Sequence, residues 1–247
     1  MSNISLSLLG MARSLASAAQ KIRIVFLGAP GSGKGTYAKE LAKYLNVDVL
    51  STGDMIREEI LSGSSFGKEL KQYSASGQLV PDNMVTDMLL EKLETGERDD
   101  NGKNGFILDG FPRSIKQAER LESEAGGISG VVNVLLKEDI ILQKLLGRRV
   151  CSKCNKSFST AAVYDEKGGY DMPALMWPEQ CTRHMIQRAD DKKDIILSRL
   201  NVYREETMPL IEYYSKEDVL KVFEVKRGLK DLPLLFQIVD DMLDQAV

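Results

Sequence analysis

The chain has 247 residues, with 33 basic and 36 acidic side chains and a formal net charge of −3. A chain of this length forms one large domain with insertions or two small domains. The near balance of charge gives no indication of a nucleic-acid or membrane partner, and no apolar run approaches the roughly 20 residues that span a bilayer.

Residues 1–20 differ in composition from the rest. They contain five serines, a single basic residue (Arg13) and no acidic residue. This resembles the start of an organellar transit peptide, which is rich in serine and poor in acidic residues. A disordered or loosely helical extension is the alternative, and both interpretations stay open. The first places the protein in a mitochondrion or another organelle, and the second in the cytoplasm.

From Lys21 onward, short apolar runs alternate with segments of helical periodicity. The expected strands are residues 22–27, 106–108, 131–136 and 220–225. The expected helices are residues 34–45, 195–214 and 232–243, with Pro209 kinking or shortening the second of these. Strands that alternate with helices predict an α/β fold with a parallel sheet covered on both faces.

Two stretches interrupt this alternation. Residues 51–80 have a helical pattern and end at a turn between Gly77 and Pro81. Residues 150–187 show little periodicity and contain all three cysteines and the only histidine and tryptophan. Such a long irregular segment is usually functional or disordered. So few cysteines in a chain of this length form no disulfide framework, which favours a reducing compartment.

A phosphate-binding loop is predicted at residues 28–36, which read GAPGSGKGT between an expected strand and an expected helix. Glycines let backbone N–H groups converge on phosphate oxygens, and Lys34 adds a charge for the β- and γ-phosphates. Gly35 stands where serine or threonine usually binds Mg²⁺, so we expect the ion to be held largely through water. The candidate ATP contacts are Gly31, Ser32, Gly33, Lys34, Gly35 and Thr36. No Asn-Lys-x-Asp sequence supports a GTPase.

Three further motifs follow: STGDMIR at residues 51–57, QLVPD at 78–82 and DGFPR at 109–113, with Gln117 just beyond. In order and spacing they resemble the adenylate kinase family over residues 21–247. The resemblance implies a P-loop three-layer fold with a parallel β-sheet core at residues 21–50, 81–146 and 190–247. It also implies a helical insert for the nucleoside monophosphate at 51–80 and a lid insert at 147–189. The implied enzyme is a monomer that converts ATP and AMP into two ADP with Mg²⁺.

The resemblance also assigns roles to individual positions. Arg57 and Arg113 would bind the AMP phosphate, and Gln117 the adenine edge. Asp109 would hold the waters around Mg²⁺, aided by Asp54. The full AMP set is Thr52, Gly53, Arg57, Gln78, Leu79, Val80, Gly110, Phe111, Pro112, Arg113, Gln117, Arg188 and Arg199.

The lid is bracketed by GRRV at residues 147–150 and QRADD at 187–191. By the resemblance, Arg148, Arg188 and Arg199 would surround the transferring phosphoryl group, with Arg148 also an ATP contact. Together with Lys34, Asp109 and Arg113 they form the candidate catalytic set. Four residues before Arg148 the family commonly has an arginine that stacks on the ATP adenine, and this chain has Lys144. Selectivity for the triphosphate base is therefore open.

Within the lid, Cys151 and Cys154 form C-x-x-C, and Cys181 and His184 form C-x-x-H. Two pairs at this spacing match a structural Cys₃His zinc site. Free, partly buried thiols in a packed lid are the alternative.

Three functions are compatible with these motifs. An adenylate kinase is favoured, because Thr52 and the long lid resemble the adenine-specific members of the family. A UMP/CMP kinase or a GTP-dependent AMP kinase of the same fold is the first alternative. A nucleotide sensor without turnover is the second, and it is disfavoured because the lysine and all five arginines are present.

Overall fold

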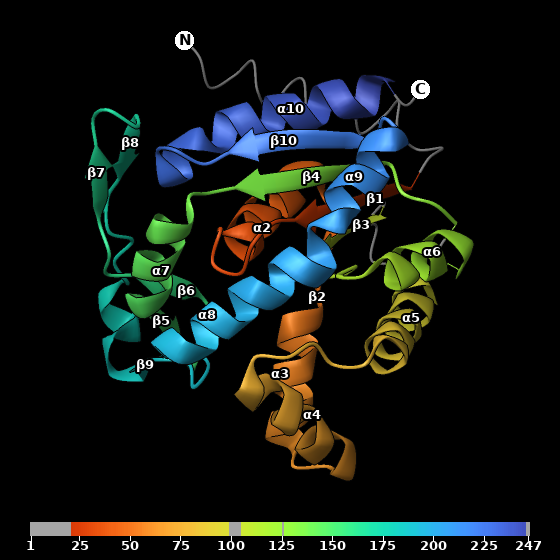
Figure 1. The fold of residues 1–247 in the computed structure, drawn as a ribbon, viewed down its shortest axis with the longest axis horizontal. Helices are drawn as coiled ribbons and strands as arrows, with labels where there is room; N and C mark the ends of the chain where they lie inside the picture. The colour runs from red at the N-terminus through yellow and green to blue at the C-terminus, as the bar shows by residue number, and fades with distance from the viewer. Residues whose placement is uncertain (1–20, 99–104, 125, 246–247) are drawn as a thin grey trace.

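The computed structural model describes residues 21–98, 105–124 and 126–245 (Figure 1). The expected extension at residues 1–20 lies outside this part. A central sheet has the strand order β10-β4-β1-β3-β2, and every neighbouring pair is parallel. Its strands are β1 (Ile22–Leu27), β2 (Asp48–Ser51), β3 (Gly105–Asp109), β4 (Gly130–Leu135) and β10 (Leu220–Glu224).

The sheet is apolar on both faces because helices cover both. In the central strand β1, Ile24 and Phe26 face one cluster of buried residues, and Val25 and Leu27 face another. Helices α2 (Lys34–Leu45) and α10 (Leu232–Gln245) complete the first cluster. Helices α5 (Asp82–Arg98), α6 (Ile115–Glu124) and α9 (Pro209–Lys216) complete the second. The expected three-layer α/β fold is confirmed (Figure 1).

All four expected strands are present, but β2 was not predicted. Its sequence DVLS is short, begins with an acidic residue and is only half-buried at the edge of the sheet, so it gives no continuous apolar run. The expected helix at 195–214 is interrupted as Pro209 predicts. Helix α8 (Lys193–Val202) passes into a wide π-helical turn, η2 (Tyr203–Thr207), and Pro209 then opens α9. There its missing N–H needs no partner.

Residues 51–80 form two helices, α3 (Thr52–Ser62) and α4 (Ser65–Ser76), which project away from the sheet (Figure 1). Side-chain oxygens of Ser51 and Ser64 accept hydrogen bonds at the two helix starts. Gly63 and Gly77 end the helices in left-handed conformations.

Residues 147–189 contain more regular structure than their periodicity predicts. After α7 (Glu138–Leu146), strands β5 (Arg148–Cys151), β6 (Ser157–Ser159) and β9 (Met185–Ile186) form a small antiparallel sheet. Strands β7 (Val163–Asp165) and β8 (Tyr170–Met172) form a separate hairpin, and η1 (Glu179–His184) is a 3₁₀ helix. Strands this short show no readable alternation of apolar and polar residues in the sequence.

None of the described helices is both long and apolar enough to cross a bilayer.

Candidate active site

A cavity of about 900 Å³ opens beyond the carboxyl ends of the parallel strands, where ligands bind in open α/β sheets. All six residues of the expected ATP loop line it, as does Asp109. The predicted lysine and arginines from the core, the helical insert and the lid all line it, among other basic side chains: Lys34, Arg57, Arg113, Arg148, Arg188 and Arg199. Polyanions are the ligands such a cavity attracts.

The loop between β1 and α2 is shaped for close approach to phosphate. Gly33 has a φ of 99° and immediately precedes α2, so the loop leads directly into the first turn of the helix. Lys34 Nζ donates to the carbonyl oxygens of Gly28 at 2.7 Å and Ala29 at 2.9 Å. Burial, together with nearby arginines, lowers the pKa of Lys34 to about 8, although Asp109 opposes the shift. A bound phosphate would favour the charged amine.

Gly35, which departs from the usual loop pattern, is explained by Asp109. A Cβ atom at position 35 would lie 2.8 Å from Asp109 Oδ2, so serine or threonine would collide with this carboxylate. Ser51 Oγ donates to the same oxygen at 3.4 Å. The Asp109 carboxylate therefore lies where the hydroxyl of a serine or threonine at position 35 would lie. A carboxylate is an oxygen ligand of the kind that Mg²⁺ or its waters prefer.

Three of the five arginines are fixed by carboxylates. Arg148 makes a bidentate pair with Asp191, which is 1% exposed. Arg199 donates to Asp190 at 2.7 Å, and Arg57 pairs with Asp54 on the preceding turn of α3. Although burial acts in the opposite direction, Arg199 and the neighbouring arginines hold the pKa of Asp190 below its ordinary value.

Arg113 and Arg188 have no carboxylate at ion-pair distance within the described residues. Arg113 Nε donates to Gly110 O at 2.9 Å, and Arg188 reaches only Ser157 Oγ, at 3.5 Å. Burial and the charges of Arg148 and its neighbours lower the pKa of Arg188 to about 10. These two guanidinium groups are not directly paired with a carboxylate of the described protein, so an anionic ligand has most to gain from them.

The expected AMP residues fall into two groups. Lining the cavity are Gly53, Arg57, Leu79, Gly110, Pro112, Arg113, Arg188 and Arg199. Thr52, Gln78, Val80, Phe111 and Gln117 are not among the lining residues.

Two members of the second group, Thr52 and Gln117, hydrogen-bond to lining residues. Thr52 Oγ1 donates to Gly110 O at 2.8 Å. Gln117 is buried, and its amide oxygen accepts from the backbone N–H of Arg113 at 2.8 Å while its amide nitrogen donates to Asp82 at 2.7 Å. In this structure Gln117 supports the turn that carries Arg113, and its adenine-edge role stays a prediction.

Lys144 lines the cavity, but its amine is engaged elsewhere. Nζ donates to the carbonyl oxygen of Ala161 at 2.8 Å, and burial lowers the pKa of Lys144. Ser159 Oγ in turn donates to Lys144 O at 3.2 Å. The Lys144 side chain therefore ties the end of α7 to Ala161 beyond β6, and the Lys144 carbonyl oxygen ties it to Ser159 in β6.

Sequence reasoning missed part of the cavity wall. Two stretches among the missed residues are Met172, Pro173, Ala174 and Leu175 in the lid, and Val225, Arg227, Gly228, Leu229 and Lys230 after β10. The second group follows a parallel strand, and the rule that ligands bind beyond such strand ends could have found it. No pattern in the lid sequence identifies the first.

The three cysteines gather at one point of the lid. The sulfur atoms of Cys151, Cys154 and Cys181 all lie within 4.8 Å of one another, with 3.8 Å between Cys154 and Cys181. The structure does not bring His184 into this group, although its carbonyl oxygen accepts from Ser152 N at 2.8 Å. Three of the four expected zinc ligands therefore lie together. His184, at the end of the 3₁₀ helix η1, contacts the turn after Cys151 through its backbone carbonyl oxygen, and its imidazole is not part of the group.

Comparison with known proteins identifies the family. The family model for adenylate kinase matches residues 26–219. Adenylate kinase 1, chloroplastic, from Arabidopsis thaliana is 40% identical over 90% of this chain and 78% of its own length. Adenylate kinase from Solanum tuberosum is 38% identical over 90% and 78%, and the one from Thermodesulfovibrio yellowstonii is 40% identical over 81% and 90%. With these motifs assembled around one cavity, the chain belongs to the adenylate kinase family.

Proposed function

We propose that this chain catalyses reversible phosphoryl transfer from ATP to AMP, giving two ADP and balancing the adenine-nucleotide pool. The observation that carries the proposal is the placement of two phosphate-binding groups in one cavity. Lys34 and its loop line this cavity, Arg57 and Arg113 line it too, and Arg188 belongs to the same cavity. Two nucleotides bound there would have their phosphates adjacent, as direct transfer requires.

The chemistry needs no general base. An ionised oxygen of the AMP phosphate attacks the γ-phosphorus of ATP, and the bond from that phosphorus to the β-phosphate oxygen breaks as ADP leaves. Family members use Mg²⁺ with ATP, and the ion neutralises phosphate charge when bound. In this chain Asp109 is placed to hold its water ligands, whereas Asp54, expected to assist, is paired with Arg57. Lys34 and the arginines then position the phosphates and stabilise the charge that develops.

The experiment that tests this function is steady-state turnover of the full chain with ATP and each of AMP, UMP and CMP. AMP should give by far the largest kcat/KM. A higher kcat/KM with UMP or CMP would favour the pyrimidine kinase, and binding without turnover would favour a sensor. Exchanging ATP for GTP tests the donor, which the departure at Lys144 leaves open.

Arg57→Ala and Arg113→Ala should each raise the KM for AMP by at least about tenfold while the Kd for ATP changes little, because a lost charge-assisted bond to phosphate costs about 1.5–3 kcal/mol. Arg120→Ala is the matched control, since Arg120 is an arginine on α6 that pairs with Glu124 and Asp87 outside the cavity. Weaker ATP binding with an unchanged KM for AMP would contradict the assignment. The two losses need not add, because both arginines would act on one phosphate.

The cysteine group suits one structural Zn²⁺, and we propose that it binds one. Two zinc–sulfur bonds of about 2.3 Å at a tetrahedral angle place their sulfur atoms about 3.8 Å apart. The distance between Cys154 and Cys181 has this value. Zinc here would join the turn after β5 to η1, order the lid and take no part in the chemistry.

Purified protein without a histidine tag should contain about one zinc per chain by elemental analysis. Cys154→Ser should abolish the metal and lower the melting temperature, because one of three thiolates is lost. His184→Ala should retain it, since the imidazole stands outside the group. Less than about half a zinc per chain after refolding with zinc supplied would favour free thiols. Loss of the metal in His184→Ala would indicate that His184 is the fourth ligand, as the sequence predicts.

We also propose that the protein is a monomer and acts in an organelle. Relatives from Arabidopsis thaliana and Oryza sativa are named chloroplastic, which supports the organelle interpretation of residues 1–20.

A further inference from the structure

The backbone of Arg113 is held by side chains from two different elements. Arg113 N donates to the amide oxygen of Gln117 on α6 at 2.8 Å, and Arg113 O accepts from Thr207 Oγ1 on η2 at 3.0 Å. The guanidinium has no carboxylate at ion-pair distance within the described residues, and its Nε donates to Gly110 O at 2.9 Å. Because no such carboxylate fixes the side chain, its direction in the cavity depends on how the backbone of Arg113 is placed.

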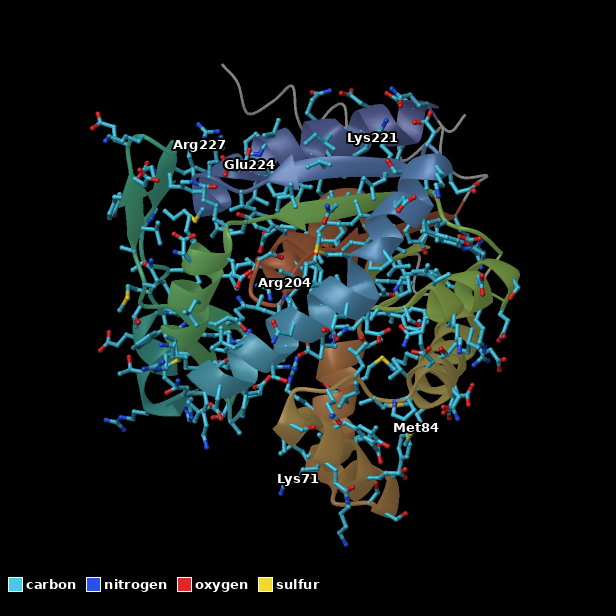
Figure 2. The ribbon with its side chains drawn as sticks, in the orientation of Figure 1. Lys71, Met84, Arg204, Lys221, Glu224 and Arg227 are labelled. Carbon is cyan, nitrogen blue, oxygen red and sulfur yellow. The ribbon has the colours of Figure 1, made fainter. Side chains whose placement is uncertain are left out.

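Thr207 is a buried residue in an exposed stretch of chain. It is 6% exposed, whereas residues 204–206 and 208–209 on either side of it are exposed. Figure 2 labels Arg204, which lies on the same turn, where α8 leads into α9. Thr207 also lines the cavity. A buried hydroxyl needs a hydrogen-bond partner, and Arg113 O is the partner that the structure provides.

The π-helical turn η2 gives Thr207 a different partner from that of an ordinary helical threonine. A threonine inside an α-helix often donates to the carbonyl oxygen four residues earlier, as Thr86 Oγ1 does to Asp82 O at 2.7 Å. In η2 the carbonyl oxygen four residues earlier, Tyr203 O, accepts from Met208 N at 2.9 Å in a π-type bond. Thr207 Oγ1 donates instead to a separate segment, 94 residues earlier in the chain. Single π-turns of this kind are frequent at functional sites.

We propose that Thr207 is a positioning residue of the monophosphate site, and that its hydroxyl fixes the backbone of Arg113 so that the guanidinium meets the phosphate of AMP. Thr207 acts through Arg113 and not by a contact of its own with the transferring group. Gln117 holds the N–H of the same residue, so the two hydrogen bonds together set the place on the cavity wall from which the guanidinium extends. The inference rests on the proposed function for the identity of AMP as the ligand.

Thr207→Val keeps the shape of the side chain but removes its donor. The KM for AMP should rise about threefold to tenfold, as expected for one lost hydrogen bond that leaves a buried carbonyl oxygen unpaired, and the KM for ATP should stay within about twofold. Thr207→Ser keeps the hydroxyl and should return the KM for AMP to within about twofold of that of the unmodified chain. An unchanged KM for AMP in Thr207→Val, or a Thr207→Ser variant as impaired as Thr207→Val, would overturn the role.

Thr86→Val is the matched control. Thr86 is also a buried threonine whose hydroxyl donates to one backbone carbonyl oxygen, but its bond lies within α5 and it is not among the cavity-lining residues. Thr86→Val should therefore leave the KM values for AMP and ATP unchanged, whatever it does to the melting temperature. Equal rises in the KM for AMP in the two valine variants, or equal rises for AMP and ATP in Thr207→Val, would reduce Thr207 to a support of the fold and overturn the proposal.

A double-mutant cycle tests whether Thr207 acts through Arg113. The Kd of AMP for the full chain is measured calorimetrically without ATP, in the unmodified chain, in each single variant and in Thr207→Val combined with Arg113→Ala. Thr207→Val should weaken AMP binding about threefold to tenfold when Arg113 is present and less than about twofold when it is replaced.

Equal weakening in both backgrounds, or AMP binding that Thr207→Val leaves unchanged, would overturn this inference alone. An unmodified chain that binds no AMP would overturn the proposed function and this inference with it. Because the measurement needs no turnover, the two failures are distinguishable.

Discussion

Replacing Lys34 with alanine is expected to lower kcat by about 10²- to 10³-fold, the usual loss when one preorganised charge is removed from a transition state. Lys34 lies in the phosphate loop, close enough to Arg113, Arg148 and Arg199 for their charges to act on it, and it supplies the loop's own positive charge for the β- and γ-phosphates. The measurement is the initial rate of ADP formation at saturating ATP and AMP.

Two controls separate chemistry from folding. Lys34 Nζ also bonds Gly28 O and Ala29 O, so its loss could loosen the loop. Lys34→Met keeps the length of the side chain without the charge and should lose as much activity as Lys34→Ala. Lys216→Ala, at an exposed position on α9, should change nothing. A kcat for Lys34→Ala within about threefold of the unmodified chain, under 1 kcal/mol of barrier, would remove the lysine from the catalytic set.

Arg188→Ala is expected to have the second large effect, a loss of about 10²- to 10³-fold in kcat. Arg188 lines the cavity and has no carboxylate partner among the described residues, so its charge is available to the transferring phosphoryl group. Arg188→Lys should recover only part of the rate, because an ammonium lacks the planar guanidinium that binds two phosphate oxygens at once. Arg183→Ala, an exposed position on η1, is the control that should retain full activity.

The same substitution should not destabilise the protein. Burial and neighbouring arginines lower the pKa of Arg188, so the fold disfavours its charged form and removing that charge relieves a cost. We therefore expect the melting temperature of nucleotide-free Arg188→Ala to stay constant or rise while activity falls. A parallel fall of both would indicate that Arg188 mainly supports the fold.

The core could be predicted from sequence because its strands carry a distinct signal. Strands β1 and β4 are covered by helices on both faces, so they read as largely apolar runs that are interrupted only by Arg23 and Asn133. Strand β2 carries no such signal, because it lies at the edge and each of its residues is only half-buried.

The site followed from motifs, but the contacts within it did not. Motif spacing placed Lys34, Arg113 and Arg188 at one cavity. It could not show which arginines would be neutralised, because the pairs of Arg148 with Asp191 and Arg199 with Asp190 depend on how the lid folds back onto α8. Nor could motif spacing show that the amide of Gln117 would hydrogen-bond with Arg113 and Asp82.

The lid was the least predictable region. Its strands are two to four residues long, and its hairpin is stabilised by the core rather than by the lid. Local sequence therefore gives neither its structure nor its attachment. The cysteine spacing did predict a cluster, because two residues between cysteines favour a tight turn that brings the sulfur atoms together.

Direct transfer of the phosphoryl group between two bound adenine nucleotides is the central claim, and isotope tracing tests it. ATP labelled in the γ-phosphate is incubated with AMP, Mg²⁺ and the full chain, and the position of the label is followed over the first turnovers. The account predicts that the label appears in the β-phosphate of ADP derived from AMP, with one unlabelled ADP released for each labelled one. Label that appears chiefly as inorganic phosphate, or stays in ATP while AMP is bound, would contradict it.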